Sequence, residues 1–197
     1  MITTSEIDPL PLLAPYIRCY AYREFDTCGT DFIKPWHASH EVNIPFFFKA
    51  VPVKLVDTAT GKILKTGKNS GVVGLSSQYN GEMTFNGCYA FFQIIFKPNG
   101  FYKVFAIPPA QIIDRIVWGE DIFSTEIELL LEQLSEAATI KEMAALANGW
   151  LLHHLNIQRW VYQQDRITAT ANLIIKKSGI IRVDSSVVSC GYKCMME

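Results

Sequence analysis

The chain has 197 residues, of which 49% are hydrophobic and 19% are charged. This composition excludes an intrinsically disordered chain, because such chains combine low hydrophobicity with high net charge. The 18 basic and 19 acidic residues leave a formal net charge of -1, so composition supplies no general attraction for nucleic acid or for an anionic membrane. Any contact with DNA therefore has to come from a local element of the chain.

The cysteine pattern and the lengths of the apolar segments indicate in which cellular compartment the protein is expected. Five cysteines are present without a CxxC pair, and the first ten residues (MITTSEIDPL) lack the basic start and apolar run of a secretory signal. The longest apolar stretches, such as residues 89–96, are far shorter than the roughly 20 residues that a membrane-spanning helix needs. We therefore expect a cytoplasmic protein with reduced thiols and no membrane partner.

Short strands are predicted for the first part of the chain, where aromatic and β-branched residues are separated by Gly, Pro and Asn. Pro45 confines its strand to an edge or a bulge, and Gly87 indicates a bulge in the longest strand. No periodic helix separates these strands, so a barrel or sandwich is favoured over a parallel sheet. The predicted strands are residues 16–25, 41–48, 51–57, 62–66, 71–76 and 83–96.

The pattern changes at Pro98, after which helices are predicted. Residues 99–105 form a short helix candidate, and residues 125–138 and 140–155 carry apolar side chains at spacings of three and four. Strands followed by two amphipathic helices give an α+β fold. Capping-box pairs stand at the start of both long helices, Thr125 with Glu128 and Thr139 with Glu142.

The helix predicted at residues 140–155 carries an apolar stripe over about four turns. Such a stripe packs either on the rest of the chain or on a second copy of it. Because Trp is enriched at interface centres, we predict that this helix forms the seam of a homodimer, with packing in the chain's own core as the alternative. The predicted seam residues are Leu146, Trp150, Leu151 and His154.

His37 and His40 form the one cluster of metal-type ligands in the sequence. In a strand, residues three apart point to opposite faces unless the chain bends between them. A zinc or iron site also needs a third ligand, and none has a convincing spacing downstream. We therefore expect no metal, no cofactor, no catalytic residue and no enzyme activity. The alternative is a small metal-dependent enzyme that uses these two histidines.

Dense aromatic runs in the strands indicate a small-molecule cavity. Alternation sends half of each run to either face, so one face can line a cavity while the other meets the helices. The absence of a Gly-rich phosphate cradle favours a small, mainly uncharged or aromatic effector. The predicted ligand-binding residues are Trp36, His37, Phe46, Phe48, Tyr89 and Phe92, with a plain core role as the alternative for each of them.

The end of the chain predicts the opening of a helix-turn-helix. Residues 156–166 are a predicted linker, and in residues 167–197 a helix stopped by Gly179 is followed by a short helical piece that ends at Gly191. The recognition helix, which supplies the base contacts, is expected after this point. We therefore expect no complete DNA-binding site in this chain, and promoter DNA as a partner only in a full-length form.

Several segments resemble AraC-type transcription regulators. Residues 13–18 (LAPYIR) look like the opening of the sensor domain of that family, and residues 95–105 (IFKPNGFYKVF) are similar to a later part of it. Residues 113–120 continue the likeness. Three further segments resemble the start of the family's DNA-binding domain, namely residues 167–175, 179–183 and 190–192.

The resemblance implies a cupin-like β-barrel at residues 10–97 and helices at residues 98–155, which together form a sensor and dimerisation domain at residues 1–155. It also implies a cytoplasmic homodimer that regulates transcription, binds promoter DNA and responds to a small-molecule effector of unknown identity. Two positions depart from the family pattern. Ser186-Val187 stands where a leucine-alanine pair is usual, and Lys193 stands where a serine is usual.

Overall fold

The computed structural model of the chain describes residues 3–36, 39–50, 54–56, 63–66, 68–79, 81–155 and 174–176. Contacts divide the chain into two units, Met1–Leu155 and Asn156–Glu197. The strands and helices named below belong to the first unit. Of the predicted linker and helix-turn-helix, only residues 174–176 are described, and they are helical. The rest of that prediction lies outside the described residues.

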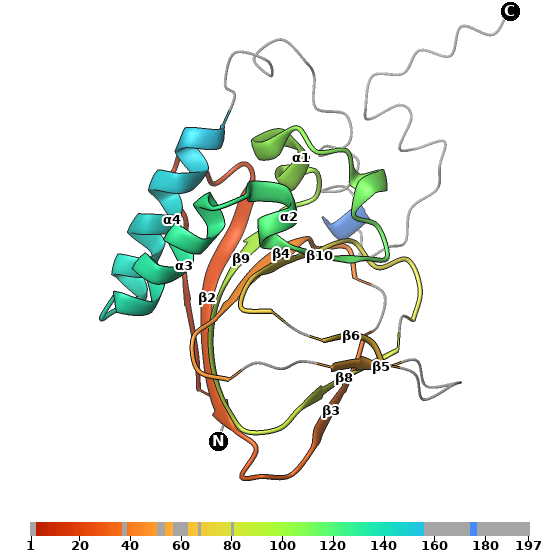
Figure 1. Ribbon diagram of the computed structural model, residues 1–197. Helices are drawn as coiled ribbons and strands as arrows, with labels where there is room; N and C mark the ends of the chain where they lie inside the picture. The colour runs from red at the N-terminus through yellow and green to blue at the C-terminus, as the bar shows by residue number, and fades with distance from the viewer. Residues whose placement is uncertain are drawn as a thin grey trace, which may run out of the picture. The chain divides into compact units, whose positions relative to one another are not determined.

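In the described part of the chain, ten strands form two antiparallel sheets (Figure 1). The strands are β1 (Thr3–Ile7), β2 (Ile17–Asp26), β3 (Phe32–Pro35), β4 (Asn43–Phe47), β5 (Lys54–Val56), β6 (Ile63–Thr66), β7 (Gly71–Val73), β8 (Glu82–Phe85), β9 (Cys88–Phe96) and β10 (Ile116–Trp118). The larger sheet has the order β1-β2-β9-β4-β7-β10, and the smaller sheet has the order β3-β8-β5-β6.

Helical segments follow β9 along the chain. They are α1 (Gly100–Phe105), the 3-10 helix η1 (Pro109–Gln111), α2 (Gly119–Phe123), α3 (Glu126–Glu136) and α4 (Ile140–His154). The side chain of Thr139 accepts a hydrogen bond from Glu142 N at 3.2 Å, which confirms the predicted cap of α4. The predicted cap at Thr125 is wrong, because this side chain makes no capping hydrogen bond and its backbone is already helical. No helix among the described residues is long and apolar enough to cross a membrane.

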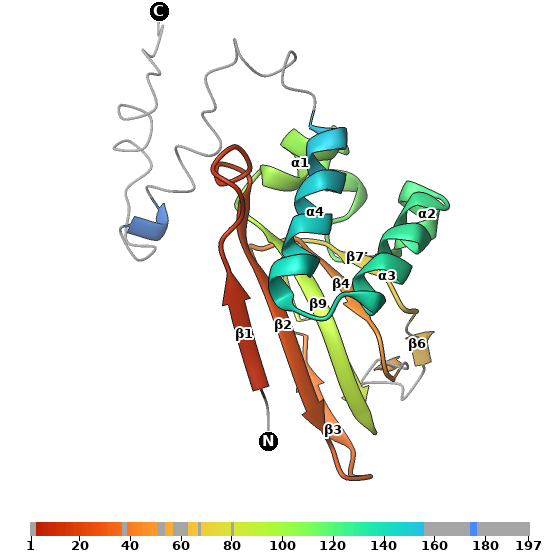
Figure 2. The same ribbon diagram turned by 90° about the vertical axis from the view of Figure 1, so that its left-hand side faces the viewer.

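The two faces of the larger sheet differ because successive side chains of a strand point to opposite sides. In the register of β2 with β9, Tyr22 is opposite Phe92 and Arg23 is opposite Phe91. Figures 1 and 2 show α3 and α4 on one side of this sheet, and Figure 1 shows the smaller sheet on the other side. We call the side that carries Tyr22 and Phe92 the helix face, and the side that carries Arg23 and Phe91 the inner face.

The main core lies between the helix face and the helices. Buried side chains from both layers belong to one apolar cluster, and these include Ile44, Phe92, Ile94 and Phe96 from the sheet and Ile127, Leu134, Ala147 and Leu151 from the helices. Removal of this apolar surface from water is the dominant stabilising term for a fold of this kind. The amphipathic stripes predicted for α3 and α4 are therefore used to cover the sheet.

The α+β class agrees with the prediction, and every strand pair formed by the described residues is antiparallel. A barrel is wrong for this part of the chain, because neither sheet closes on itself. β1 and β10 are the edges of the larger sheet, and β3 and β6 are the edges of the smaller one. β1, β3 and β10 were not predicted from the sequence. The residues of β1 (TTSEI) are mostly polar and exposed, and they lack the apolar alternation of a half-buried strand.

Candidate functional site

The predicted ligand-binding residues do not form a single site. Phe46 and Phe92 are fully buried on the helix face, inside the main core, with ring centroids 6.5 Å apart. Tyr89 is also fully buried, but it lies in an aromatic cluster on the inner face. Tyr89 and Phe92 are three residues apart on one strand, so they point to opposite sides. The prediction is therefore corrected: Phe46 and Phe92 are core residues.

The other members of that prediction are also dispersed. Trp36 is buried, and its backbone N–H donates a hydrogen bond to the carbonyl of Gly81 at 2.9 Å. Phe48 is half-buried and packs against the main core. His37 lies outside the described residues.

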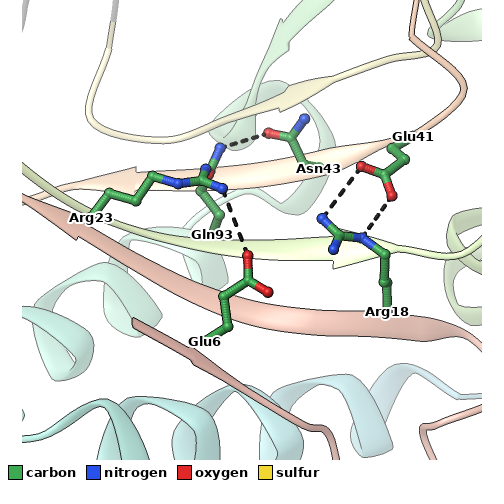
Figure 3. A network of polar contacts seen from close by, with 6 residues as sticks. All are labelled: Glu6, Arg18, Arg23, Glu41, Asn43 and Gln93. Carbon is green, nitrogen blue, oxygen red and sulfur yellow. Dashed lines mark hydrogen bonds and ion pairs between the residues drawn. The ribbon is translucent and has the colours of Figure 1, made fainter. Parts of the chain in front are cut away.

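Polar side chains from four neighbouring strands instead form a row on the inner face (Figure 3). They are Glu6 of β1, Arg23 of β2, Gln93 of β9 and Asn43 of β4. The guanidinium group of Arg23 lies 3.9 Å from the Glu6 carboxylate and donates a hydrogen bond to Gln93 Oε1. Gln93 Nε2 donates to Asn43 Oδ1 at 3.2 Å. We call these four residues the inner polar row.

The strand register explains how this row forms. Glu6, Ala21 and Gln93 are opposite one another across β1, β2 and β9. Ala21 is fully buried and has only a methyl group, so the longer side chain of Arg23 crosses above it between the two flanking polar residues. Gln93 is the polar interruption in the apolar strand β9, and this interruption is the sequence signal that could have located the inner face.

A bidentate ion pair lies beside the inner polar row. Arg18 Nε is 2.6 Å from Glu41 Oε1, and a second guanidinium nitrogen is 3.5 Å from Glu41 Oε2 (Figure 3). The same face carries a small buried cluster of Cys19, Ala21 and Ile95. Burial raises the pKa of the Cys19 thiol, so this group is protonated at neutral pH and is a poor nucleophile.

An aromatic cluster continues the inner face. Phe25 of β2 stacks on Tyr89 with ring centroids 5.1 Å apart, and Phe91 packs on Phe47 at the same centroid distance. Phe32 packs edge-on against Phe25 at 6.1 Å. Because Phe32 belongs to β3 of the smaller sheet, this contact shows that the two sheets face each other here.

Lys34 brings a second cation to this region. It is two residues from Phe32 on β3, and Arg23 is two residues from Phe25 on β2, so each cation shares the face of its neighbouring ring. The contact between the two rings therefore places Arg23 and Lys34 on facing surfaces. Lys34 keeps access to solvent, but burial lowers its pKa, and the positive charge of Arg23 lowers it further.

The metal-dependent alternative gains no support from the described residues. These residues contain no group of three or more His, Cys, Asp or Glu side chains that is able to hold a metal ion. His40 is exposed, and its predicted partner His37 lies outside the described part of the chain. A role of the two histidines in catalysis therefore stays an untested alternative.

Part of the predicted dimer seam is used inside the domain. Leu151 is fully buried in the main core, and Leu146 and Trp150 are half-buried against it. His154 is also half-buried, with its ring 5.1 Å from that of Trp150. Leu151 is therefore unavailable to a partner subunit, because α4 needs its most apolar side to cover the sheet. Dimerisation itself stays a prediction.

His154 lies at the end of α4, and its Nε2 is 3.0 Å from Glu126 Oε2. Burial lowers the pKa of His154 from its ordinary value of 6.5, which outweighs the raising effect of the Glu126 carboxylate. The unfolded chain therefore takes up this proton at a higher pH than the folded chain does. Stability associated with His154 is thus present above pH 6.5 and is lost as the pH falls through the pKa of the folded state.

We expect the Tm of the full chain to fall between about pH 7.5 and about pH 5.5, and the His154→Gln variant to show a smaller fall. The matched control is His153→Gln, because His153 is the exposed neighbour on the same helix. The control should keep most of the pH dependence of the parent, because the charge of His153 lowers the pKa of His154 less than burial does. Thermal unfolding monitored by circular dichroism measures all three proteins, and an unchanged pH dependence in His154→Gln would contradict this assignment.

Residues 5–118 match the model of a family described as a domain of unknown function, DUF6597. The match covers more than half of the 197 residues. The chain belongs to this family. The DUF6597 region begins within β1 and ends at the last residue of β10, so it contains the whole inner polar row and precedes α3 and α4. No curated protein and no solved structure gives a significant match to the chain.

Proposed function

We propose that this DUF6597 chain is the effector-sensing and dimerising part of an AraC-type transcription regulator, with a cupin-like arrangement of its two sheets. The observation that carries the proposal is a contact between the two segments that resemble this family, residues 13–18 and 95–105. Ile17 pairs with Phe96, and Lys97 N donates a hydrogen bond to the Tyr16 carbonyl at 2.8 Å. Segments far apart in the sequence therefore form one structural unit.

Packing at this junction explains why these residue types stand in the two segments. Apolar side chains of both segments belong to the main core, among them Leu13, Ile17, Phe96, Phe101 and Val104. Gly100 stands at the closest approach, where a Cβ atom would lie 2.0 Å from the Tyr16 carbonyl oxygen. The spacing of these residues thus supports a resemblance of fold in addition to one of sequence.

The inner face has the composition of a small-ligand site. Such sites are mostly apolar and aromatic, with a few polar groups that fix the orientation of the ligand. The aromatic cluster supplies the apolar wall, and the inner polar row supplies hydrogen-bonding groups on β-strands. Because strands hold side chains more rigidly than loops do, this arrangement suits selective binding of a small effector.

The homodimer of this proposal uses the outward side of the helical layer. Leu129 of α3 is 58% exposed and is free of the main core. We expect Leu129→Glu to weaken self-association about tenfold or more, because it places a charge in an apolar contact. The control is Ile33→Glu on β3, where the side chain is 53% exposed. Sedimentation of the parent as a monomer, or equal effects of both variants, would contradict this interface.

A reporter assay tests the regulatory function. The 197-residue chain is fused to a DNA-binding domain that represses its reporter only as a dimer, and a library of small molecules is added to the cells. We expect repression that depends on the chain and changes with at least one molecule. The Leu129→Glu variant should lose repression, whereas Ile33→Glu should keep it. Absence of repression, or repression that no molecule changes, would count against an effector-sensing dimer.

A further inference from the structure

Arg23 and Lys34 are less closely paired with carboxylates than Arg18 and Lys49 are. Arg18 forms a close bidentate pair with Glu41, and Lys49 pairs directly with Glu24 on the opposite side of β2. Arg23 lies 3.9 Å from Glu6, beyond hydrogen-bonding distance, and Lys34 has no ion-pair partner among the described residues. Two cations thus face each other, and the one carboxylate beside them is only loosely placed against Arg23.

The charge of this region is unbalanced by one unit. Arg23 and Lys34 contribute two positive charges, and Glu6 contributes one negative charge, which leaves a single positive charge. A ligand with one negative charge would neutralise it and would relieve the repulsion between the two cations. The planar guanidinium group of Arg23 fits a carboxylate through two parallel hydrogen bonds.

The side chains beside the cations define the rest of the ligand. Phe91 and Phe47 lie in the same cross-strand row as Arg23, and Met83 is opposite Lys34 on β8. Phe47 and Met83 are half-buried, so each keeps apolar surface for a ligand to cover. This surface favours an apolar body over a sugar phosphate, whose several hydroxyl and phosphate oxygens would need many more polar partners.

We propose that Arg23 and Lys34 bind the carboxylate of a small organic monoacid whose aromatic or aliphatic body lies against Phe47 and Met83. This inference rests on the proposed function, because it names the effector class of the same inner face. Gln93 already hydrogen-bonds Arg23 and Asn43, so it positions the guanidinium group for the ligand. The sequence favours a small, mainly uncharged or aromatic effector over a phosphorylated one, and the acid proposed here keeps the apolar or aromatic body and adds one negative charge.

Isothermal titration of the full 197-residue chain tests this effector class with matched probes. Benzoate, phenylacetate and octanoate are compared with benzamide, phenylacetamide and octanamide, and inorganic phosphate serves as a simple anion at equal ionic strength. We expect at least one carboxylate to bind about tenfold or more tightly than its amide, because a charge-assisted hydrogen bond is stronger than a neutral one. Phosphate should bind more weakly than that carboxylate.

Variants locate the site. Lys34→Met and Arg23→Gln should each weaken binding of that carboxylate about tenfold and leave binding of the amide nearly unchanged. Lys49→Met is the matched control, since it removes one lysine whose partner Glu24 lies on the other side of β2, and it should leave the affinity unchanged. Lys34→Met tests the site even if Arg23→Gln fails to fold, because Lys34 makes no ion pair within the described region.

Several outcomes would overturn this effector class. These are a panel in which no carboxylate binds, amides that bind as tightly as their acids, phosphate that binds more tightly than every carboxylate, or an equal loss in Lys34→Met and Lys49→Met. Other outcomes distinguish failure of this effector class from failure of the proposed function. A reporter that responds only to uncharged molecules supports effector sensing while it overturns the acid, and an acid that binds at Arg23 and Lys34 without changing the reporter leaves the site intact while it counts against the regulator.

Discussion

Gly100→Ala is expected to lower the free energy of unfolding by about 3 kcal/mol or more. A Cβ atom at this position would lie 2.0 Å from the carbonyl oxygen of Tyr16 and 2.9 Å from its carbonyl carbon. Both are backbone atoms, so rotation of a side chain cannot relieve the clash. The chain would instead have to separate α1 from the segment that enters β2, and the core side chains at this junction would lose contacts.

Helix propensity predicts the opposite sign for this change, because Ala is favoured over Gly by about 1 kcal/mol inside a helix. Gly149 of α4 is the matched control, since it is exposed and a Cβ atom there meets nothing within 4 Å. Gly149→Ala should raise the free energy of unfolding by about 0.5–1 kcal/mol. Urea denaturation measures both variants. A Gly100→Ala protein as stable as the parent would contradict the close approach on which the proposed function depends.

The single strand predicted at residues 83–96 is two strands, β8 and β9, in different sheets, and β4 lies between β9 and β7 although Pro45 predicted an edge or a bulge. The periodicity of the sequence was sufficient to predict β2, β7 and the two long helices, because burial on one side imposes a repeat of two or of about 3.6 residues. It was not sufficient to tell which side of β9 meets the helices. This strand is apolar on both faces, so Tyr89 and Phe92 look equivalent in the sequence although they lie on opposite sides. Gln93 marks the inner face, and its meaning emerges only with its partners Arg23 and Asn43.

The facing cations were not predictable from composition. The approach of Lys34 to Arg23 depends on how β3 folds over β2, and that geometry is set by contacts such as Phe25 with Phe32. Tertiary packing likewise determines whether Leu151 lies in the core or in a subunit interface. An apolar stripe has the same spacing whether it covers the chain's own sheet or a second subunit, and only tertiary packing distinguishes the two.

Asn148→Ala is expected to lower the free energy of unfolding by about 2–3 kcal/mol, because it leaves the buried Tyr20 hydroxyl and the partly buried Leu10 N–H without their shared acceptor. Asn148 Oδ1 accepts a hydrogen bond from the Tyr20 hydroxyl at 2.7 Å and another from Leu10 N at 3.3 Å. Asn148 belongs to α4, whereas Tyr20 belongs to β2 and Leu10 precedes it, so one amide oxygen ties the last helix to the sheet. Burial raises the pKa of Tyr20, so the hydroxyl keeps the proton that it donates.

A double-mutant cycle separates this interaction from the helix propensity of Ala, which by itself favours the variant by about 0.5 kcal/mol. Tyr20→Phe alone should cost about 1 kcal/mol, since Leu10 N still uses the amide oxygen. In the double variant, the cost should be at least about 1 kcal/mol smaller than the sum of the two single costs, because the hydroxyl is removed together with its acceptor. Urea denaturation of the four proteins measures the coupling. Additive costs would show that Tyr20 and Asn148 contribute independently, and the hydrogen bond between them would then add nothing to the attachment of α4 to the sheet.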